Sequence, residues 1–302
     1  MHKHLISILD WSPEQHRAVL NRAKVFKQGR EDTRLPGKTL ALLFEKPSLR
    51  TRVSFDMAMF QLGGHCIYLS PAEVGLGQRE SARDTAQVLS RYVSAIAART
   101  FAHRTVEELA EHGSVPVINA LSDQEHPCQA LADFVTLEQR RGDAAGLTLA
   151  YVGDGNNCAV SLLYLAAMVG TNFRIASPKG YQLTDEQVAR AKEHAARSKA
   201  TVFTTEDPAE AVRGADAVYT DVWTSMGQEA EKQERTRIFA PYQVNEALLR
   251  KAKPDAVLLH PLPAHHGEEV AQGVLYLPQS AVFDQAENRL HAQKAVLATL
   301  LE

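Results

Sequence analysis

The chain has 302 residues, a formal net charge of −3 at pH 7 and 45% hydrophobic residues, so it is long enough for two domains with full cores. A balance this close to neutral gives no basis for nucleic-acid binding. No apolar run reaches the roughly 18 residues that a membrane-spanning helix needs. We therefore expect a globular protein that binds neither nucleic acid nor a membrane.

Cysteine usage and the N-terminal sequence bear on the compartment. The three cysteines, Cys66, Cys128 and Cys158, are widely spaced, and the spacing is not that of a zinc site. The first residues show neither the apolar core of a signal peptide nor an Arg-rich leader. Both observations favour a cytoplasmic protein with free thiols.

Short apolar runs that predict buried strands alternate along the whole chain with helical patterns. The predicted strands are residues 39–44, 65–69, 95–99, 115–119, 147–152, 173–176, 201–204, 217–221 and 256–260. The predicted helices are residues 53–62, 82–92, 106–112, a longer one that includes 131–138, then 159–169, 185–198, 209–213, 245–251 and 287–301. This alternation is typical of parallel sheets that are covered by helices on both faces.

Two such sets of elements predict an α/β protein with two doubly wound, parallel-sheet domains that share a cleft. The polar stretch at residues 140–144 follows a long helix and marks the expected boundary. We expect domains at 1–140 and 141–286, with a C-terminal helix, 287–302, that packs back on the first domain and joins the two.

The most informative segment is Ser48-Leu49-Arg50-Thr51, which lies where the first predicted strand gives way to a helix. A helix N-terminus presents unpaired N–H groups and partial positive charge, and Arg adds a planar set of donors suited to phosphate. The segment therefore predicts an anion site. An ordinary Ser N-cap beside solvated arginines is the alternative.

Other unusual polar residues also follow the carboxyl ends of predicted strands, where ligands gather in parallel sheets. They are Arg99, the segments at 126–129, 154–157 and 221–227, and the segment at 260–264. Each has a plainer interpretation: His126 or Asn157 as a helix cap, Arg99 as part of a buried ion pair. Because all of them lie at the carboxyl ends of predicted strands, a functional interpretation of the set is stronger than one of any single residue.

These segments together resemble the aspartate/ornithine carbamoyltransferase family. The resemblance rests on Glu45 to Arg52, His126-Pro127-Cys128-Gln129, Asp221 to Gly227 and the Leu262-Pro263 segment, and it extends from about Leu5 to the C-terminus. The Ser-Met-Gly loop and the segment at 153–157 are similar to the ornithine-specific members. The resemblance implies transfer of a carbamoyl group from carbamoyl phosphate to the δ-amine of L-ornithine, which gives citrulline in arginine metabolism.

For the donor, the resemblance implies a set of residues that surround carbamoyl phosphate. The implied catalytic residues are Arg50, Arg99 and His126. The implied donor-binding residues are Ser48, Leu49, Arg50, Thr51, Arg99, His126, Gln129, Pro261, Leu262 and Arg289. Because charge develops on the carbonyl oxygen as the tetrahedral intermediate forms, preorganised donors there lower the barrier.

For the acceptor, the resemblance implies that Asn157 contacts the α-carboxylate of ornithine and that Asp221 pairs with its α-ammonium. Ser225 and Met226 would complete the binding of the amino acid. The amine attacks directly, so neither a cofactor nor a metal ion is implied. The family also implies a homotrimer or a multiple of trimers. The segment at 73–81 would lie at the subunit interface, and Gly75 occupies a position where some relatives place a donor-contacting side chain.

Two departures from the family pattern affect these expectations. Leu49 replaces a threonine, so that only its backbone amide is available to phosphate. Pro261 replaces the cysteine of the usual His-Cys-Leu-Pro of ornithine enzymes, and the Leu262-Pro263 peptide is expected to be cis by resemblance. The open alternatives are another amine acceptor (lysine, a modified ornithine or putrescine) and a non-catalytic relative that binds metabolites. A nicotinamide-dependent oxidoreductase is disfavoured, because the glycine fingerprint and its acidic partner are incomplete.

Overall fold

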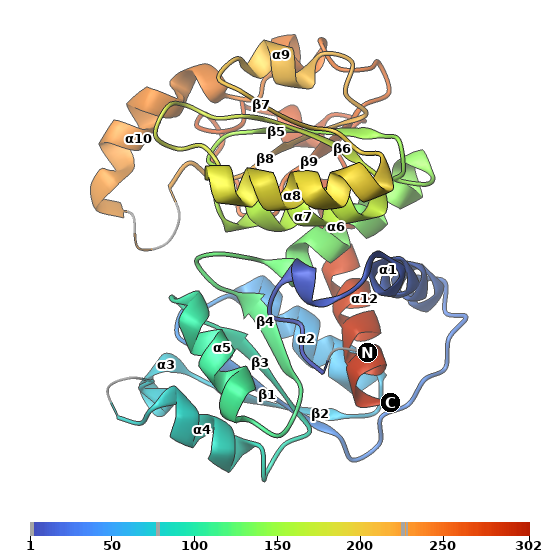
Figure 1. Ribbon diagram of the computed structural model, residues 1–302, viewed down its shortest axis with the longest axis vertical. Coiled ribbons are helices and arrows are strands. Elements are labelled where there is room, and N and C mark those ends of the chain that lie inside the picture. Colours follow the sequence, from blue (N-terminus) through green and yellow to red (C-terminus); the bar gives the residue numbers. More distant parts are fainter. Residues whose placement is uncertain (1–2, 77–78, 225–226, 228) are drawn as a thin grey trace. The chain divides into compact units, whose positions relative to one another are not determined.

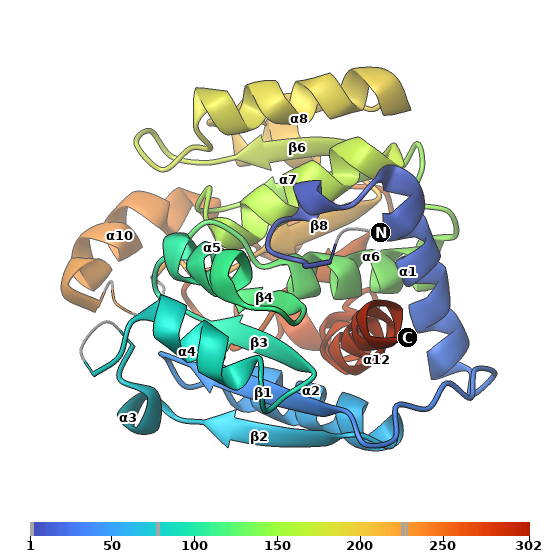
Figure 2. The ribbon, with the colours of Figure 1, turned by 60° about the horizontal axis from the view of Figure 1, so that its bottom comes forward.

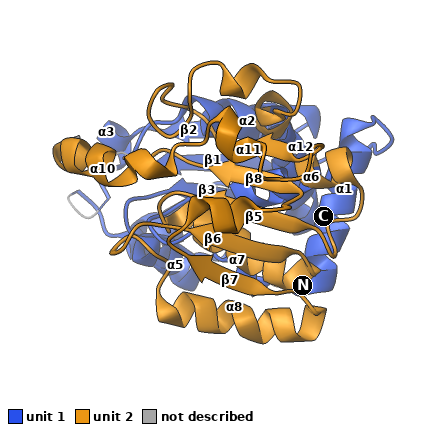
Figure 3. Ribbon diagram, turned by 90° about the horizontal axis from the view of Figure 1, so that it is seen from above, with its two compact units in different colours: residues 1–135, 287–302 blue, residues 136–286 orange. Residues whose placement is uncertain are grey.

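The computed structural model describes residues 3–76, 79–224, 227 and 229–302 (Figure 1). The chain forms two compact units (Figure 3). The first unit comprises the residues up to 135 together with 287–302, and the second comprises 136–286. In the described part of the chain, no helix combines the length and the apolar sequence that crossing a bilayer requires.

The first unit is built on a four-stranded parallel sheet with the order β2-β1-β3-β4. Its strands are β1 (Thr39–Phe44), β2 (His65–Leu69), β3 (Ala95–Arg99) and β4 (Val117–Leu121). Its helices are η1 (Ile8–Asp10), α1 (Pro13–Lys27), α2 (Leu49–Gln61), α3 (Pro71–Val74), α4 (Ala82–Leu89) and α5 (His103–His112). Apolar residues of β1 and β3 pack against α4 and α5, which cover one face of the sheet (Figure 2).

The second unit is built on a five-stranded parallel sheet with the order β7-β6-β5-β8-β9. Its strands are β5 (Thr148–Val152), β6 (Asn172–Ala176), β7 (Val202–Thr205), β8 (Ala217–Thr220) and β9 (Val257–Leu259). Its helices are α7 (Asn157–Val169), α8 (Asp185–Ser198), α9 (Pro208–Val212), η2 (Glu229–Glu231), α10 (Lys232–Phe239), η3 (Ala240–Tyr242), α11 (Glu246–Leu249) and η4 (Val274–Tyr276). Figure 1 shows α8 and α9 on opposite faces of this sheet. Helix α7 is buried along nearly its whole length, and within its unit it contacts both β6 and the neighbouring α8.

Two helices run from one unit into the other, namely α6 (Pro127–Arg141) and α12 (Val282–Leu301). The predicted fold class, two parallel-sheet α/β domains with a C-terminal helix, is confirmed. The first three strands and α8 also have the predicted bounds.

Some boundaries differ from the prediction for identifiable reasons. Strand β4 begins at Val117 and not at 115, because Pro116 has no N–H to give to the ladder and only its carbonyl accepts from Ile96. Helix α2 begins at Leu49, four residues before the predicted start, because Ser48 caps it. Helix α12 begins at Val282, earlier than the predicted 287.

Helices α1 and α10 were not predicted. In α10 only Arg235 and Phe239 are buried, so its polar sequence carries no apolar periodicity. In α1 the buried residues Val19, Leu20, Ala23 and Phe26 recur at helical spacing, so the signal was present in the sequence and was overlooked. The start of α1 was also marked, because Ser12 and Gln15 form a capping box ahead of Pro13.

A buried carboxylate, Asp216, ties the start of β5 to the segment that follows α11. Its oxygens accept hydrogen bonds from the backbone N–H of Thr148 (3.0 Å), from Arg141 Nη2 (2.9 Å) and from Lys253 Nζ (2.7 Å). Burial would raise the pKa of Asp216, but the hydrogen bonds from Lys253, Thr148 and Arg141 outweigh burial and hold this pKa below its ordinary value. The carboxylate is therefore ionised in the folded protein at neutral pH.

We predict that Asp216→Asn lowers the free energy of unfolding by about 1.5–3 kcal/mol, the usual contribution of hydrogen bonds to a charged group. Because the folded-state pKa lies below the unfolded value of 3.8, the stabilisation is complete above about pH 5 and is lost as pH falls through the folded-state pKa. Urea unfolding of both proteins between pH 3 and pH 7 measures the difference.

Asp255→Asn is the matched control, since Asp255 pairs with the same Arg141 but its side chain is 69% exposed. The control change should cost much less than Asp216→Asn, because a solvent-exposed ion pair contributes little to stability. Equal destabilisation by the two substitutions, or a loss from Asp216→Asn that does not shrink at low pH, would contradict the assignment.

Candidate functional site

The predicted anion segment of the first unit forms the N-terminus of α2. Ser48 is the N-cap: its Oγ accepts from the backbone N–H of Thr51 (3.3 Å) and donates to Thr51 Oγ1 (3.0 Å). The interpretation of Ser48 as an N-cap is thus correct as local structure. It does not exclude anion binding, because the first N–H groups of the helix still point out of its end.

Arg289 of α12 lies beside this helix end. Its Nη2 donates to Thr51 Oγ1 (3.1 Å) and its Nη1 donates to Gln129 Oε1 (2.7 Å). Gln129 in turn donates through Nε2 to Asp133 Oδ1 (2.7 Å). Arg289, Gln129 and Thr51 are each at most 4% exposed. Three segments of the chain, α2, α6 and α12, therefore bring their predicted donor-binding residues into direct contact.

His126 lies among cations in the same unit. Its pKa is well below the ordinary histidine value, first because the ring is buried and then because Arg289, Arg99 and Lys46 repel a second positive charge. The imidazole is therefore neutral at physiological pH, with one N–H to donate. Arg99, the last residue of β3, is 7% exposed, and its position at the end of β3 is the predicted one.

Lys46 belongs to this group, although the sequence analysis assigned it no role. Burial lowers the pKa of Lys46, and Arg99 lowers it further. Its ammonium lies 4.9 Å from the ring centroid of Phe101. Burial also lowers the pKa of Arg50, which is half-buried near the start of α2. A site with this many cations, around a neutral histidine, is suited to a small anion with more than one negative charge.

In the second unit, Asp221 follows β8 and is held by Asn156. Asn156 Nδ2 donates to Asp221 Oδ2 (2.9 Å), while Asn156 Oδ1 accepts from the backbone N–H groups of Cys158 and Ala159 at the start of α7. Asn156 is therefore the helix cap, and Asn157 is the first helical residue. Asn157 is the residue predicted to contact a ligand, whereas the residue that orients Asp221 is its neighbour Asn156.

Gly155 allows the chain to approach the segment before α8. A Cβ atom at this position would lie 2.6 Å from the backbone nitrogen of Leu183, a distance that real contacts do not show. The absence of a side chain lets the turn between β5 and α7 pack closely there, and this turn carries both asparagines.

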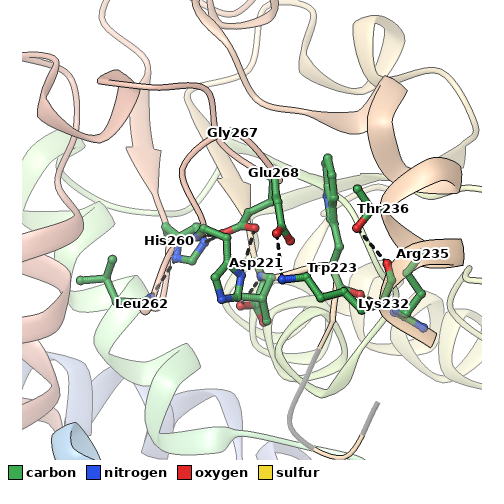
Figure 4. Close-up of polar contacts among 12 residues, drawn as sticks. Asp221, Trp223, Lys232, Arg235, Thr236, His260, Leu262, Gly267 and Glu268 are labelled. Carbon is green, nitrogen blue, oxygen red and sulfur yellow. Dashed lines mark hydrogen bonds and ion pairs between the residues drawn. The ribbon is translucent and has the colours of Figure 1, made fainter. Parts of the chain in front are cut away.

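Arg235 of α10, like Lys46 and Asn156, is a residue to which no role was assigned from the sequence. Its side chain is 3% exposed and donates to the backbone carbonyl of Trp223 (Figure 4). It also pairs with Asp154. The guanidinium also lies over the ring of Tyr181 (4.7 Å). Arg235 thus fastens the segment after Asp221 to α10. No sequence signal identified it, because α10 itself was not predicted.

His260 fixes the turn that contains Pro261. Its Nδ1 accepts from the backbone N–H of Leu262 (2.9 Å) (Figure 4). Its backbone N–H donates to Gln285 Oε1 (2.8 Å). Leu262 has a positive φ of 55°, which a leucine rarely adopts, so this hydrogen bond helps to hold an unusual backbone. The Leu262-Pro263 peptide is cis, as expected.

The remaining two predicted acceptor residues, Ser225 and Met226, lie outside the described residues. The structure thus brings the predicted donor residues of the first unit together around Thr51 and His126, and it joins Asp221 to the turn before α7 in the second.

Comparisons with known proteins agree with this reading of the sequence. The carbamoyl-P binding domain of the aspartate/ornithine carbamoyltransferases matches residues 3–139, and the Asp/Orn binding domain matches residues 145–300. An ornithine carbamoyltransferase of Anoxybacillus flavithermus is 53% identical over 99% of this chain and 96% of its own length. One of Bacillus subtilis is 53% identical over 99% of this chain and 94% of its own length.

A solved structure gives the same result. Ornithine carbamoyltransferase from Pyrococcus furiosus superposes with a TM-score of 0.96 at 49% identity, covering 99% of this chain and 97% of that one. Matches of this extent leave neither unit outside the comparison. The chain belongs to the aspartate/ornithine carbamoyltransferase family.

Proposed function

We propose that this chain transfers the carbamoyl group of carbamoyl phosphate to the δ-amine of L-ornithine, giving L-citrulline and phosphate, as a cytoplasmic enzyme of arginine biosynthesis. The observation that carries the proposal is about 50% identity, over nearly the whole chain, to relatives named ornithine carbamoyltransferase. A relative from Pyrococcus furiosus with 50% identity is named as anabolic.

In this proposal, the first unit binds the donor. Ser48, Arg50 and Thr51 bind the phosphate, with the backbone amide of Leu49 as a further donor. The proposal is supported by the capped N-terminus of α2, where N–H groups and the helix dipole favour an anion. Arg289, buried and held between Thr51 and Gln129, adds positive charge at the same place.

Arg99, His126 and Thr51 then act on the carbamoyl group. Each donates a hydrogen bond to the carbonyl oxygen, on which negative charge develops as the amine attacks. Because the pKa of His126 is low, its imidazole stays neutral throughout the reaction. It therefore acts as a hydrogen-bond donor through its one N–H and does not give up that proton. Loss of one such donor typically costs roughly 3–4 kcal/mol of transition-state stabilisation.

The second unit binds the acceptor. Asn157 contacts the α-carboxylate of ornithine, Asp221 pairs with its α-ammonium, and Ser225 and Met226 complete the binding. The proposal is supported by the fixed position of Asp221, whose Oδ2 accepts from Asn156. The backbone carbonyls of Pro261 and Leu262 accept from the carbamoyl NH₂. That contact needs no thiol, so the cysteine that ornithine enzymes usually carry is dispensable for it.

The experiment that tests the function is product formation from carbamoyl phosphate with a panel of acceptors. Ornithine should give citrulline at a rate far above those with lysine, N-acetylornithine, putrescine and aspartate. The physical reason is that Asp221 selects an α-ammonium, which putrescine lacks, and repels a second carboxylate, which aspartate carries.

Asp221→Asn is the variant arm of the same experiment. It should raise the KM for ornithine by about 10- to 100-fold, the range expected for a lost charged hydrogen bond, and leave the KM for carbamoyl phosphate unchanged. A preference for lysine or putrescine would assign a different acceptor to the chain. Binding of carbamoyl phosphate without turnover of any acceptor would indicate a non-catalytic relative.

The phosphate assignment predicts that Arg50→Ala raises the KM for carbamoyl phosphate by about 10- to 100-fold, because a charged hydrogen-bond donor to phosphate is lost. Arg52→Ala is the control: Arg52 belongs to the same helix turn, but its guanidinium lies 4.0 Å from the ring of Tyr68. Initial-rate kinetics with both variants decide the question, and equal effects of the two would remove Arg50 from the phosphate site.

We also propose that the chain assembles as a homotrimer or a multiple of trimers. One face of α2 exposes a stripe of large apolar side chains, which a soluble monomer rarely leaves in water. The stripe consists of Leu49, Val53, Met57 and Phe60, which are 77%, 50%, 40% and 71% exposed. A second copy of the chain is the partner of this stripe. Gly75, in the segment expected at the interface, ends α3 in a left-handed conformation, and residues 77–78 of that segment lie outside the described residues.

Phe60→Glu should therefore shift the mass in solution toward the monomer, since a charge would be buried in an apolar contact. Light scattering coupled to size-exclusion chromatography measures the mass. Phe203→Glu, at an exposed apolar residue of β7, is the control and should leave the mass unchanged. A monomeric wild-type protein would refute the assembly.

A further inference from the structure

The turn between β9 and η4 carries a group of metal-ligating side chains to which the proposed reaction gives no part. His265, Glu268 and Glu269 each offer one ligand atom, and these atoms lie within 4.8 Å of one another. None of the three is among the residues proposed to touch a substrate. The spacing matters because a side-chain adjustment of about an ångström would let all three reach one ion.

Glu269 is the unusual member, because its carboxylate is fully buried. Its Oε1 accepts from His260 Nε2 (3.1 Å) and from the backbone N–H of His265 (2.6 Å). Its Oε2 is buried, has no hydrogen bond in the part of the chain that the structure describes, and lies 3.6 Å from His265 Nδ1. A buried carboxylate oxygen with no hydrogen-bond donor is costly, so something of positive charge at this oxygen would be strongly favoured.

The group is open to solvent on the side of His265. The side chain of His265 is 43% exposed, which leaves a path from solvent to the group.

The backbone of the turn is held by several hydrogen bonds independent of any ion. The N–H of Gly267 donates to Val270 O (2.7 Å), and the N–H of Glu268 donates to His265 O (2.9 Å). Gln243 Nε2 donates to the carbonyls of Gly267 and Glu268. The ligand atoms thus belong to a turn whose backbone is fixed by hydrogen bonds.

Lys232 of α10 is the one other charged group that contacts these ligands in the described residues. Its Nζ lies 3.0 Å from Glu268 Oε1 (Figure 4). An ammonium at this place satisfies Glu268, but it does not touch the free oxygen of Glu269. Lys232 therefore competes with any ion that uses Glu268.

We propose that His265 Nδ1, Glu269 Oε2 and Glu268 form a binding site for a divalent transition-metal ion such as Zn²⁺. One imidazole and two carboxylates are ligands that first-row divalent metals accept, with water in the remaining position. His260 stands behind the site, since it donates to the other oxygen of Glu269 and so orients that ligand. The site does not depend on the carbamoyl-transfer proposal, because binding is measured without substrates.

The test uses the full chain after removal of metal by a chelator. Zn²⁺ is titrated against a chromophoric chelator, and Co²⁺ is added separately so that its visible absorption reports the ligand geometry. Wild-type protein should bind one ion per chain at this site. His265→Asn should weaken that binding by about tenfold or more and abolish the Co²⁺ band, because an imidazole ligand is lost.

Two further variants make the result specific. His266→Asn is the matched control: its ring stacks on Tyr276 and is not part of the group, so affinity should not change. Lys232→Gln removes the competing ammonium and should tighten binding several-fold. Equal affinity in wild type and His265→Asn, or no gain in Lys232→Gln, would overturn the proposal. Circular dichroism on each variant establishes that the fold is retained.

Discussion

The arrangement of the residues proposed to bind carbamoyl phosphate depends on one buried arginine. Arg289 enters from the last helix of the chain and hydrogen-bonds Thr51, from the start of α2, and Gln129, from α6. A buried guanidinium without such partners would be costly, so the three segments stabilise one another's positions. Burial first, and then the positive charge of Arg289, holds the pKa of His126 low, so that its imidazole is neutral. The capped helix end, the cations and the neutral histidine together suit the small anion that we propose binds there.

In the second unit, neutral and ion-paired side chains hold the predicted acceptor-binding residues in place. The amide oxygen of Asn156 accepts from the start of α7, and its amide nitrogen donates to Asp221. This contact holds the carboxylate through a neutral hydrogen-bond donor and not through a salt bridge. The guanidinium of Arg235 instead pairs with Asp154 and donates to the backbone carbonyl of Trp223. No ion pair of Asp221 is found within the described residues, so this oriented carboxylate is available to the α-ammonium that we propose it binds.

Pro261 is the point at which this chain departs from the ornithine-enzyme pattern. The surrounding turn is nevertheless tightly specified, because His260 accepts from the N–H of Leu262 while donating to Glu269. The hydrogen bonds that shape the turn use the ring of His260 and the backbone of Leu262, and neither needs the side chain at 261. Substitution at 261 therefore changes a side chain in a turn that its neighbours define. Glu269 in turn links this arrangement to the candidate metal ligands His265 and Glu268.

The sequence by itself determined the fold class, the strands and the residues at the ends of those strands. Alternating apolar runs report burial on both faces of a parallel sheet, and the clusters around Arg50, His126 and Asp221 stand out against that pattern. The sequence did not determine which partners hold these residues. Lys46, Asn156 and Arg235 act through contacts with residues distant in the chain, or through a helix whose polar sequence gives no periodic signal. The contact of Arg289 with Thr51 joins residues more than two hundred positions apart, and only tertiary packing brings such groups within hydrogen-bonding distance.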